Sequence, residues 1–450
     1  MSASGGVSVG IGDHLLVDLY ELTMLQGYVE SGMVGPASFE LFVRRLPGTR
    51  NFLIAAGLEQ ALEFLDGFAL SEVEVARLAL VHRFSSQALQ TMRDLRFSGD
   101  VDAVPEGTVV FANEPLISVT APLPEGQIVE TRLTNLVHFQ SLVASKAVRA
   151  VLAAAGKPLV DFGLRRAHGG EAGTLAARAM YLAGFGGTSN VRAGSEFGIP
   201  VFGTMAHSFV QAHDDERQAF LDFAIANPGQ EITLLIDTYD TEAATTQLVA
   251  LAPELAARGS KVAAVRIDSG DLGMHARRVR RILDEGGLRD TRIIVSSGLD
   301  EHEIASLLAS GAPVDGFAPG TKVITSADAP YLDCAYKLVE YAGRPRLKRS
   351  EGKETWPGRK QVWRVRDARG VLVADHVTRA DERVEGAEPL LVPVMRGGRP
   401  VGPRPSLEDI RARVTRELAG LPAALRALGP APPFSPQPSD ALVAEPPRKI

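Results

Sequence analysis

Three short apolar stretches, ITLLIDT (232–238), VAAVRID (262–268) and RIIVSS (292–297), each end in polar residues. A segment with helical spacing of its apolar residues follows each stretch. The steps from Asp237 to Asp268 and from Asp268 to Ser297 are each roughly 30 residues, the length of one strand, one helix and two loops. This alternation predicts parallel β-α units.

The same pattern extends outward in both directions, because LVDF (159–162), PVFGT (200–204) and VDGF (314–317) are also apolar and end next to polar residues or glycine. We therefore expect an α/β domain over residues 158–330. Parallel units form either a barrel or an open sheet. The glycines at 169–173 and 184–187 do not supply the G-x-G-x-x-G of a dinucleotide-binding sheet, so a barrel of the TIM type is favoured.

The segments on either side of this domain show a different sequence pattern. Short extended stretches separated by turn residues predict an α+β domain over residues 1–126, and apolar residues at helical spacing predict a connecting helix over 127–157. Over residues 331–428, further extended stretches and one helix predict that the chain returns to a β-rich domain. The proline-rich residues 429–450 are expected to be a disordered tail.

Composition limits the classes of function. The 450 residues carry 48 Lys+Arg against 54 Asp+Glu, and the isoelectric point is near 5.9. This balance argues against partners that are nucleic acids or membrane surfaces, which require a basic patch. No Lys or Arg precedes Arg44, so no targeting peptide is expected and the protein should stay in the cytosol. Chemistry on small molecules is the better expectation.

Three polar residues follow predicted strands and should share one edge. His207 lies in GTMAHS (203–208), while Asp237 and Asp268 end two of the stretches quoted above. Each alone is more often a helix cap or a loop residue. Together they predict a site in which a histidine faces two carboxylates, an arrangement that tunes imidazole basicity.

Other strand ends indicate a ligand that carries phosphate. Ser297-Gly298 and Gly320-Thr321 can offer backbone N–H groups to an oxyanion, and late β-α loops commonly bind phosphate in barrels. Phe162 and Arg165, in DFGLRR (161–166), suit a flat anionic ligand. The combined pattern is typical of a site for a phosphorylated sugar and a small planar acid.

Seven strings make the sequence resemble the nicotinate phosphoribosyltransferase family over about residues 10–400. They are DLYELTM (18–24), DFGLRRAHG (161–169), GTSN (187–190), GTMAHS (203–208), IDTYDT (236–241), VRIDSGDL (265–272) and GFAPGTKV (316–323). The resemblance implies an irregular α/β barrel joined to a β-rich domain that both ends of the chain build. It also implies the synthesis of nicotinate mononucleotide and pyrophosphate from nicotinate and 5-phosphoribosyl 1-pyrophosphate, in NAD salvage. ATP is hydrolysed in the family's reaction and Mg²⁺ is its expected metal ion.

The resemblance also implies a role for each matching residue. His207 would be phosphorylated by ATP, and Asp237 and Asp268 would stabilise charge on the ribose or hold Mg²⁺ and ribose hydroxyls. Tyr20, supplied by the partner chain of a homodimer, would stack on the pyridine ring opposite Phe162. The residues expected to bind nicotinate or the phosphoribosyl group also include Arg165, Arg266, Gly203 and Thr204.

Ser189 bears on which pyridine base, nicotinate or nicotinamide, the protein would use. Enzymes that use nicotinamide resemble this chain but carry Asp near the position of Ser189, and an Asp would repel the carboxylate of nicotinate. Ser189 therefore predicts nicotinate as the substrate. The alternatives are a nicotinamide or quinolinate phosphoribosyltransferase, and a catalytically silent paralogue that binds metabolites.

Overall fold

The computed structural model describes residues 14–348 and 356–444, and these residues belong to two compact units. The first unit contains residues up to 145 together with those from 329 onward, and the second contains residues 146–328. The division falls inside helix α6 (Glu130–Ala153), earlier than the predicted boundary at 158. Its last turns belong to the second unit because the Lys146 ammonium pairs with carboxylates of Glu301 and Asp328, at 2.6 and 2.8 Å.

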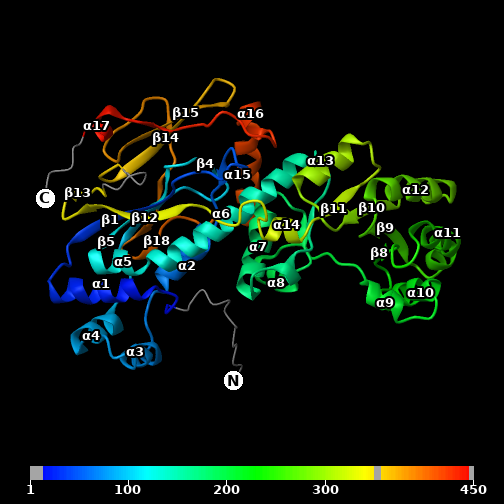
Figure 1. Ribbon diagram of the computed structural model, residues 1–450, viewed down its shortest axis with the longest axis horizontal. Helices are drawn as coiled ribbons and strands as arrows, with labels where there is room; N and C mark the ends of the chain where they lie inside the picture. The colour runs from blue at the N-terminus through cyan, green and yellow to red at the C-terminus, as the bar shows by residue number, and fades with distance from the viewer. Residues whose placement is uncertain (1–13, 349–355, 445–450) are drawn as a thin grey trace. The chain divides into compact units, whose positions relative to one another are not determined.

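The first unit is built around an antiparallel sheet in the order β13-β12-β1-β5-β3-β17-β18 (Figure 1). Its strands are β1 (Pro36–Val43), β3 (Asp100–Ala103), β5 (Pro115–Pro122), β12 (Cys334–Tyr341), β13 (Arg344–Pro345), β17 (Val392–Arg396) and β18 (Arg399–Pro400). Seven of the eight residues of β1 are buried, so both faces of this strand are covered. The three N-terminal strands β1, β5 and β3 therefore lie side by side in the middle of the sheet, with C-terminal strands on both sides of them.

Two smaller sheets and several helices complete this unit. The smaller sheets pair β2 (Leu53–Ile54) with β4 (Val109–Val110), and order β16 (Glu388–Pro389), β14 (Lys360–Arg366), β15 (Leu372–Arg379) and β19 (Gln437–Pro438). The helices besides α6 are α1 (Leu19–Glu30), α2 (Leu58–Asp66), α3 (Glu72–Ala79), α4 (Ser86–Asp94), α5 (Leu123–Ile128), α15 (Leu407–Ala419), α16 (Ala423–Arg426) and α17 (Asp440–Val443).

The prediction of a disordered tail is wrong for residues 429–444. Gln437 pairs with His376 of β15, the ring of Phe434 lies 4.2 Å from that of Phe111, and Leu442 is buried. Apolar residues spaced between the prolines supply these contacts, which composition alone does not reveal. Residues 445–450 of the predicted tail lie outside the described residues.

The first unit contains a buried group of charged residues around Arg364. Arg364 donates to both carboxylate oxygens of Asp375, at 3.0 and 2.7 Å, and to Glu417 at 2.7 Å. Glu114 accepts a hydrogen bond from the backbone N–H of Phe111, but its buried Oε1 receives none. Burial and then the neighbouring Asp375 raise the pKa of Glu114 well above its ordinary value. The raised pKa favours the protonated, neutral form of the Glu114 carboxyl.

Glu114→Gln should make the stability of the protein less sensitive to alkaline pH. Folded wild type holds a proton on Glu114 that the unfolded chain releases, so its stability falls as pH rises between the unfolded and folded pKa values. In that range the free energy of unfolding falls by about 1.4 kcal/mol per pH unit. Glutamine keeps a donor and an acceptor but does not titrate, so this pH dependence should be absent from the variant. Urea unfolding from pH 5 to 9 measures this difference, with exposed Glu30→Gln as the control. Parallel stability curves for wild type and E114Q would contradict a proton held on Glu114 in the folded protein.

The second unit is built from parallel strands. Strands β8 (Glu231–Leu235), β9 (Lys261–Ile267), β10 (Arg292–Ser296) and β11 (Gly316–Ala318) form one sheet, and β6 (Val160–Asp161) pairs with β7 (Gly187–Thr188). Single bridges join Leu159 to Phe317 and Thr188 to Val201. All these pairings are parallel, so they give the continuous order Val201, β7, β6, β11, β10, β9, β8.

Helices connect and flank these strands, as Figure 1 shows for α10, α11 and α12 beside β8–β10. The helical segments are η1 (Leu164–Arg166), α7 (Gly170–Ala183), α8 (Val191–Phe197), α9 (His207–Gln211), α10 (Glu216–Ala226), α11 (Thr241–Ala257), α12 (Leu272–Glu285), α13 (Glu301–Ala309) and α14 (Thr321–Ile324). The predicted strand at 200–204 is reduced to the bridge at Val201, whereas β7 was not predicted as a strand. Both segments are too short for a period-two pattern to distinguish them from loops.

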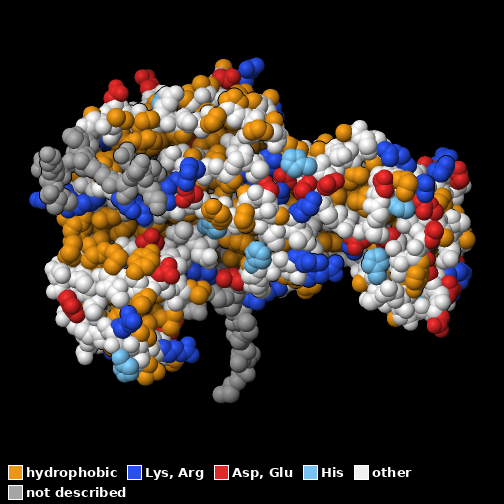
Figure 2. Space-filling model, in the orientation of Figure 1, with side chains coloured by type: hydrophobic (Ala, Val, Ile, Leu, Met, Phe, Trp, Pro, Cys, Tyr) orange, Lys and Arg blue, Asp and Glu red, His pale blue; other side chains and the backbone are white. Residues whose placement is uncertain are grey.

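Acidic and basic side chains are interspersed over the visible face of each unit (Figure 2). Within residues 14–348 and 356–444, no helix combines the length and the apolarity needed to span a membrane.

Candidate functional site

Polar side chains at the carboxyl ends of β8, β9 and β10 form one hydrogen-bonded network. Asp237 Oδ2 accepts hydrogen bonds from the backbone N–H of Asp268, at 2.8 Å, and from the hydroxyl of Ser269, at 2.6 Å. Because β8 and β9 are parallel and adjacent, their ends meet, and the Asp237 carboxylate fixes the first residues of the loop after β9. The two predicted aspartates are thus brought together.

Asp268 is held from two strands. Its Oδ1 accepts from the Ser296 hydroxyl of β10 at 2.5 Å, and the guanidinium of Arg266 lies 2.9 Å from the same oxygen. Arg266 also donates to Ser296 Oγ at 2.8 Å and to Thr204 Oγ1 at 3.2 Å. The side chain of Arg266 is only 11% exposed, so these contacts fix its orientation. Arg266 therefore links the predicted residues Thr204 and Asp268.

His207 is the first residue of α9 and joins the network through one carboxylate only. Its Nε2 lies 3.8 Å from Asp268 Oδ2, an ion-pair distance, while its Nδ1 is 3.1 Å from Thr238 Oγ1. Asp237, the other predicted carboxylate, forms no ion pair with His207 within the described residues; its Oδ2 instead accepts hydrogen bonds from the loop after β9. The His207 side chain is 38% exposed, so a ligand can reach it.

The aromatic ring of Phe162 lies against Arg266 at one side of the network. The guanidinium carbon of Arg266 lies 5.1 Å from the centre of the Phe162 ring, within cation-π range. The backbone N–H of Phe162 donates to Pro319 O at 3.1 Å. A Cβ atom on Gly320 would lie 3.0 Å from Phe162 O, so glycine permits this close approach. Phe162 and Gly320 therefore occupy neighbouring strand ends.

Ser189 and a buried aspartate stand at the adjacent strand end. The backbone N–H of half-exposed Ser189 donates to Asp161 O at 2.8 Å. Asp161 is fully buried, and its carboxylate accepts from Gly163 N and Thr188 Oγ1, both at 2.7 Å. Burial raises the pKa of Asp161, against the lowering effect of these two hydrogen bonds. Asp161 orders the turn that carries Phe162.

Sequence reasoning did not single out Asp161, Thr238 or Ser269 as site residues, and it did not foresee that the Ser296 hydroxyl donates to Asp268. Each stands next to a predicted site residue or begins a quoted motif, which is the signal that could have found them. Their roles depend on which oxygen each side chain contacts, and spacing does not give that information.

Two of the four predicted phosphate-binding residues, Ser297 and Gly298, line a cavity in the same unit. Ser297 and Gly298 have φ values of 72° and 63°, and the left-handed region is costly for a serine. The cavity, of about 660 Å³, is lined by Ser297, Gly298, Gly270 and Lys322 among others. Lys322 Nζ lies 2.9 Å from Asp300 Oδ2. The turn at Ser297 and Gly298 thus forms part of the wall of this cavity.

Four predicted residues lie outside this network in the described part of the chain. Arg165 in η1, Gly203 and Thr321 are exposed and make no side-chain hydrogen bond to it there. Tyr20 belongs to the first unit, where it is 42% exposed on α1. Burial, followed by the charge of Glu130, raises the pKa of Tyr20, so the phenol is neutral.

Comparisons with known proteins identify the family. Residues 15–138 match the nicotinate phosphoribosyltransferase (NAPRTase) N-terminal domain, and residues 158–341 match the nicotinate phosphoribosyltransferase (NAPRTase) family. The chain belongs to the nicotinate phosphoribosyltransferase family. It is therefore an enzyme of NAD salvage, and the resemblance seen in the sequence is confirmed.

The relatives cover nearly the whole chain. Nicotinate phosphoribosyltransferase pncB2 of Mycobacterium tuberculosis is 48% identical over 415 residues, which are 92% of this chain and 89% of that protein. The crystal structure of human nicotinic acid phosphoribosyltransferase is 31% identical, with a TM-score of 0.86 and coverage of 95% of this chain and 98% of the human one. A nicotinate-nucleotide pyrophosphorylase from Pyrococcus furiosus is 25% identical, with a TM-score of 0.76 and coverage of 93% and 99%. These likenesses confirm the mixed α/β fold of this phosphoribosyltransferase.

Proposed function

We propose that this nicotinate phosphoribosyltransferase joins nicotinate to 5-phosphoribosyl 1-pyrophosphate at the ends of β8, β9 and β10, with ATP hydrolysis through phosphorylated His207. The products are nicotinate mononucleotide and pyrophosphate. The observation that carries this proposal is the network in which Arg266, Asp268 and His207 are joined by contacts of 2.9 and 3.8 Å. In this network Arg266 offers a positive charge to phosphate, Asp268 offers a negative charge to the ribose, and His207 offers a ring nitrogen that can accept a phosphate.

The reaction separates charge, and the network matches that separation. As pyrophosphate leaves C1 of the ribose, positive charge develops on the ring and negative charge on the departing oxygens. The carboxylate of Asp268, held by Ser296 and Arg266, would stabilise the ring. The nitrogen of nicotinate attacks C1 and carries no proton to remove, so the enzyme needs no base for this step. Fixed orientation supplies the rest of the acceleration.

One oxygen in the network suits Mg²⁺. Asp237 Oδ1 is buried and has no hydrogen-bond partner, whereas both oxygens of Asp268 already face Ser296, Arg266 or His207. Within residues 14–348 and 356–444, no cluster of three or more His, Cys, Asp or Glu residues could hold a metal ion. Mg²⁺ commonly binds one or two carboxylates together with substrate phosphates, so Asp237 would hold it with the pyrophosphate group. When bound, Mg²⁺ neutralises the charge on the leaving oxygens.

His207 would couple ATP to turnover without acting on the base. Thr238 contacts Nδ1, which orients the ring, and the side chain is accessible. Phosphorylation adds about −1.5 to −2 charge and three acceptor oxygens. A phosphate on this ring would lie beside Asp268, and repulsion between the two would favour states in which Mg²⁺ or Arg266 screens them.

The nicotinate pocket would combine residues of two chains. Phe162, at the end of β6, would stack on one face of the pyridine ring, and Tyr20 of the partner subunit would stack on the other. The exposure of Tyr20, Leu16 and Leu19 in one short segment supports a homodimer in which this segment is covered. Gly203 and Thr204 would line the pocket, and Arg165 and Arg266 would address the carboxylate and the phosphoribosyl oxygens.

The same proposal includes a closed barrel. The parallel order from Val201 to β8 already runs through β7, β6, β11, β10 and β9, and closure would bring Val201 beside β8. Ser297, Gly298, Gly320 and Thr321 would then lie on the rim where their backbone N–H groups can bind the 5-phosphate.

Release of pyrophosphate tests this function directly. The enzyme is supplied with 5-phosphoribosyl 1-pyrophosphate and Mg²⁺, with nicotinate, nicotinamide or quinolinate in turn, with and without ATP. We expect turnover with nicotinate, and faster turnover with ATP. Turnover with another base would change the substrate, and no turnover that depends on the donor would indicate a silent binding protein.

Ser189→Asp should weaken the use of nicotinate. A carboxylate at this strand end would repel the carboxylate of the substrate, and an unfavourable charge pair of this kind costs on the order of 1–3 kcal/mol, or roughly 10- to 100-fold in kcat/KM. Ser189→Asn is the matched control, because it adds similar volume without charge. Equal selectivity for nicotinate over nicotinamide in S189D and wild type would remove Ser189 from the pocket.

A further inference from the structure

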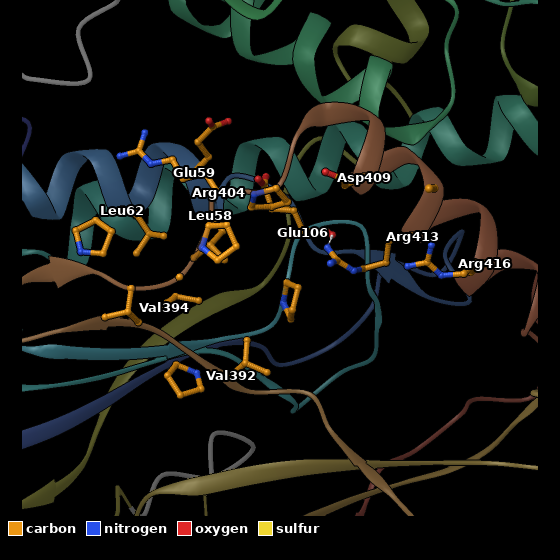
Figure 3. A pocket seen from close by; sticks show the side chains of 18 residues that line it. Leu58, Glu59, Leu62, Glu106, Val392, Val394, Arg404, Asp409, Arg413 and Arg416 are labelled. Carbon is orange, nitrogen blue, oxygen red and sulfur yellow. Dashed lines mark hydrogen bonds between the residues drawn. The ribbon is translucent and has the colours of Figure 1, made fainter.

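A cavity in the first unit takes no part in the reaction described above. It has a volume of about 600 Å³ and lies between α2, the turn after β3, β17 and α15 (Figure 3). Leu58, Leu62, Val392 and Val394 line it together with the rings of Pro105, Pro393, Pro400, Pro403 and Pro405. Its volume is typical of sites that enclose a small molecule.

One end of this cavity is cationic. Arg413 and Arg416 are three residues apart on α15, so they share one face of the helix. In Figure 3 their side chains lie at one end of the cavity, and Leu62 and Val394 lie at the other. The same two arginines, with Arg366, also line a second cavity of about 400 Å³. They therefore stand where an apolar cavity and a polar one adjoin.

Neither of these two arginines forms a salt bridge within the described residues, although the carboxylates of Glu417, Glu106 and Asp409 attract Arg413. Arg413 Nη1 donates to the backbone oxygen of Glu106, at 2.6 Å, and in the described part of the chain no ion pair involves Arg413 or Arg416. In contrast, Arg366 pairs with Glu417. Burial, and then repulsion from Arg416, lowers the pKa of Arg413. An anion that bridged the two guanidinium groups would relieve this repulsion.

We propose that the two cavities form one nucleotide-binding site, with phosphate at Arg413 and Arg416 and the flat base among the prolines of the apolar cavity. Guanidinium groups bind phosphate through paired hydrogen bonds. Proline rings lose no rotamer freedom when a ligand covers them. Glu59 and Asp409, on the wall of the same cavity, offer carboxylate oxygens to ribose hydroxyls (Figure 3). None of these residues belongs to the network at the ends of β8, β9 and β10.

Calorimetric titration of the full-length enzyme with AMP tests the phosphate end. We expect saturable binding to wild type that Arg416→Glu weakens roughly 10- to 100-fold, the effect of losing a charge-assisted hydrogen bond. Arg416 is exposed, so the substitution should not unfold the chain. Arg411→Glu is the matched control, because Arg411 lies on the same helix but lines neither cavity. Equal affinity in wild type and R416E would overturn the proposal.

A second variant tests the base end and keeps both arginines. Ala412→Trp should fill the apolar cavity and abolish AMP binding while inorganic phosphate still binds. If phosphate binds as tightly as AMP and A412W changes neither, the site binds simple anions and the nucleotide assignment fails. AMP binding that disappears in Arg266→Ala and persists in R416E belongs to the substrate site, which would also overturn the proposal. These outcomes do not depend on whether the proposed reaction is correct.

Discussion

Asp268→Asn should reduce kcat/KM for nicotinate roughly 100- to 1,000-fold, the usual cost of removing a fixed group that stabilises transition-state charge. Asparagine keeps an oxygen for Ser296 and Arg266 but loses the negative charge that faces the ribose. The loss should appear mainly in kcat, because that charge matters most when the bond to pyrophosphate breaks. Steady-state release of pyrophosphate, with saturating donor and nicotinate, measures it.

The control for this variant is Asp284→Asn on α12, where the carboxylate is half exposed and pairs with Arg280. It should retain wild-type kinetics. A loss smaller than about threefold in D268N, with an unchanged melting temperature, would show that the carboxylate acts only in holding Arg266 and Ser296. Its assignment to the reaction would then be wrong.

His207→Ala should abolish the stimulation by ATP and preserve some turnover without ATP. A phosphate on His207 can accept new charge-assisted hydrogen bonds, each worth roughly tenfold in binding or rate, and alanine cannot carry that phosphate. The rate of H207A should therefore be the same with and without ATP. Incubation with γ-labelled ATP should label wild type in an acid-labile form and leave H207A unlabelled.

His302→Ala is the matched control, since this histidine is 65% exposed on α13, outside the network. It should keep both the label and the stimulation. Complete loss of turnover in H207A without ATP would mean that His207 acts in glycosyl transfer itself. Label retained in H207A would place the phosphorylated residue elsewhere.

The parallel strands were predictable because apolar stretches of four to seven residues recur at a nearly constant interval. Asp237 and Asp268 could be placed at neighbouring strand ends for the same reason, since parallel strands point the same way. The two-residue strand β7 could not be predicted, and the predicted strand at 200–204 is only a bridge at Val201, because one or two residues carry no periodic signal. Gln437 and Leu442 were also unpredictable, since partners from β15 order a segment whose composition is typical of disorder.

The sequence by itself determined the α/β class of the second unit, the family and the residues able to carry charge, because these follow from residue type, order and spacing. The tertiary structure decided which oxygen faces which group. It turned Asp237 toward the loop after β9, gave His207 one carboxylate and one threonine as neighbours, and left Arg413 and Arg416 beside an apolar cavity. These outcomes depend on side-chain directions and on contacts between residues far apart in the chain, which local sequence patterns do not encode.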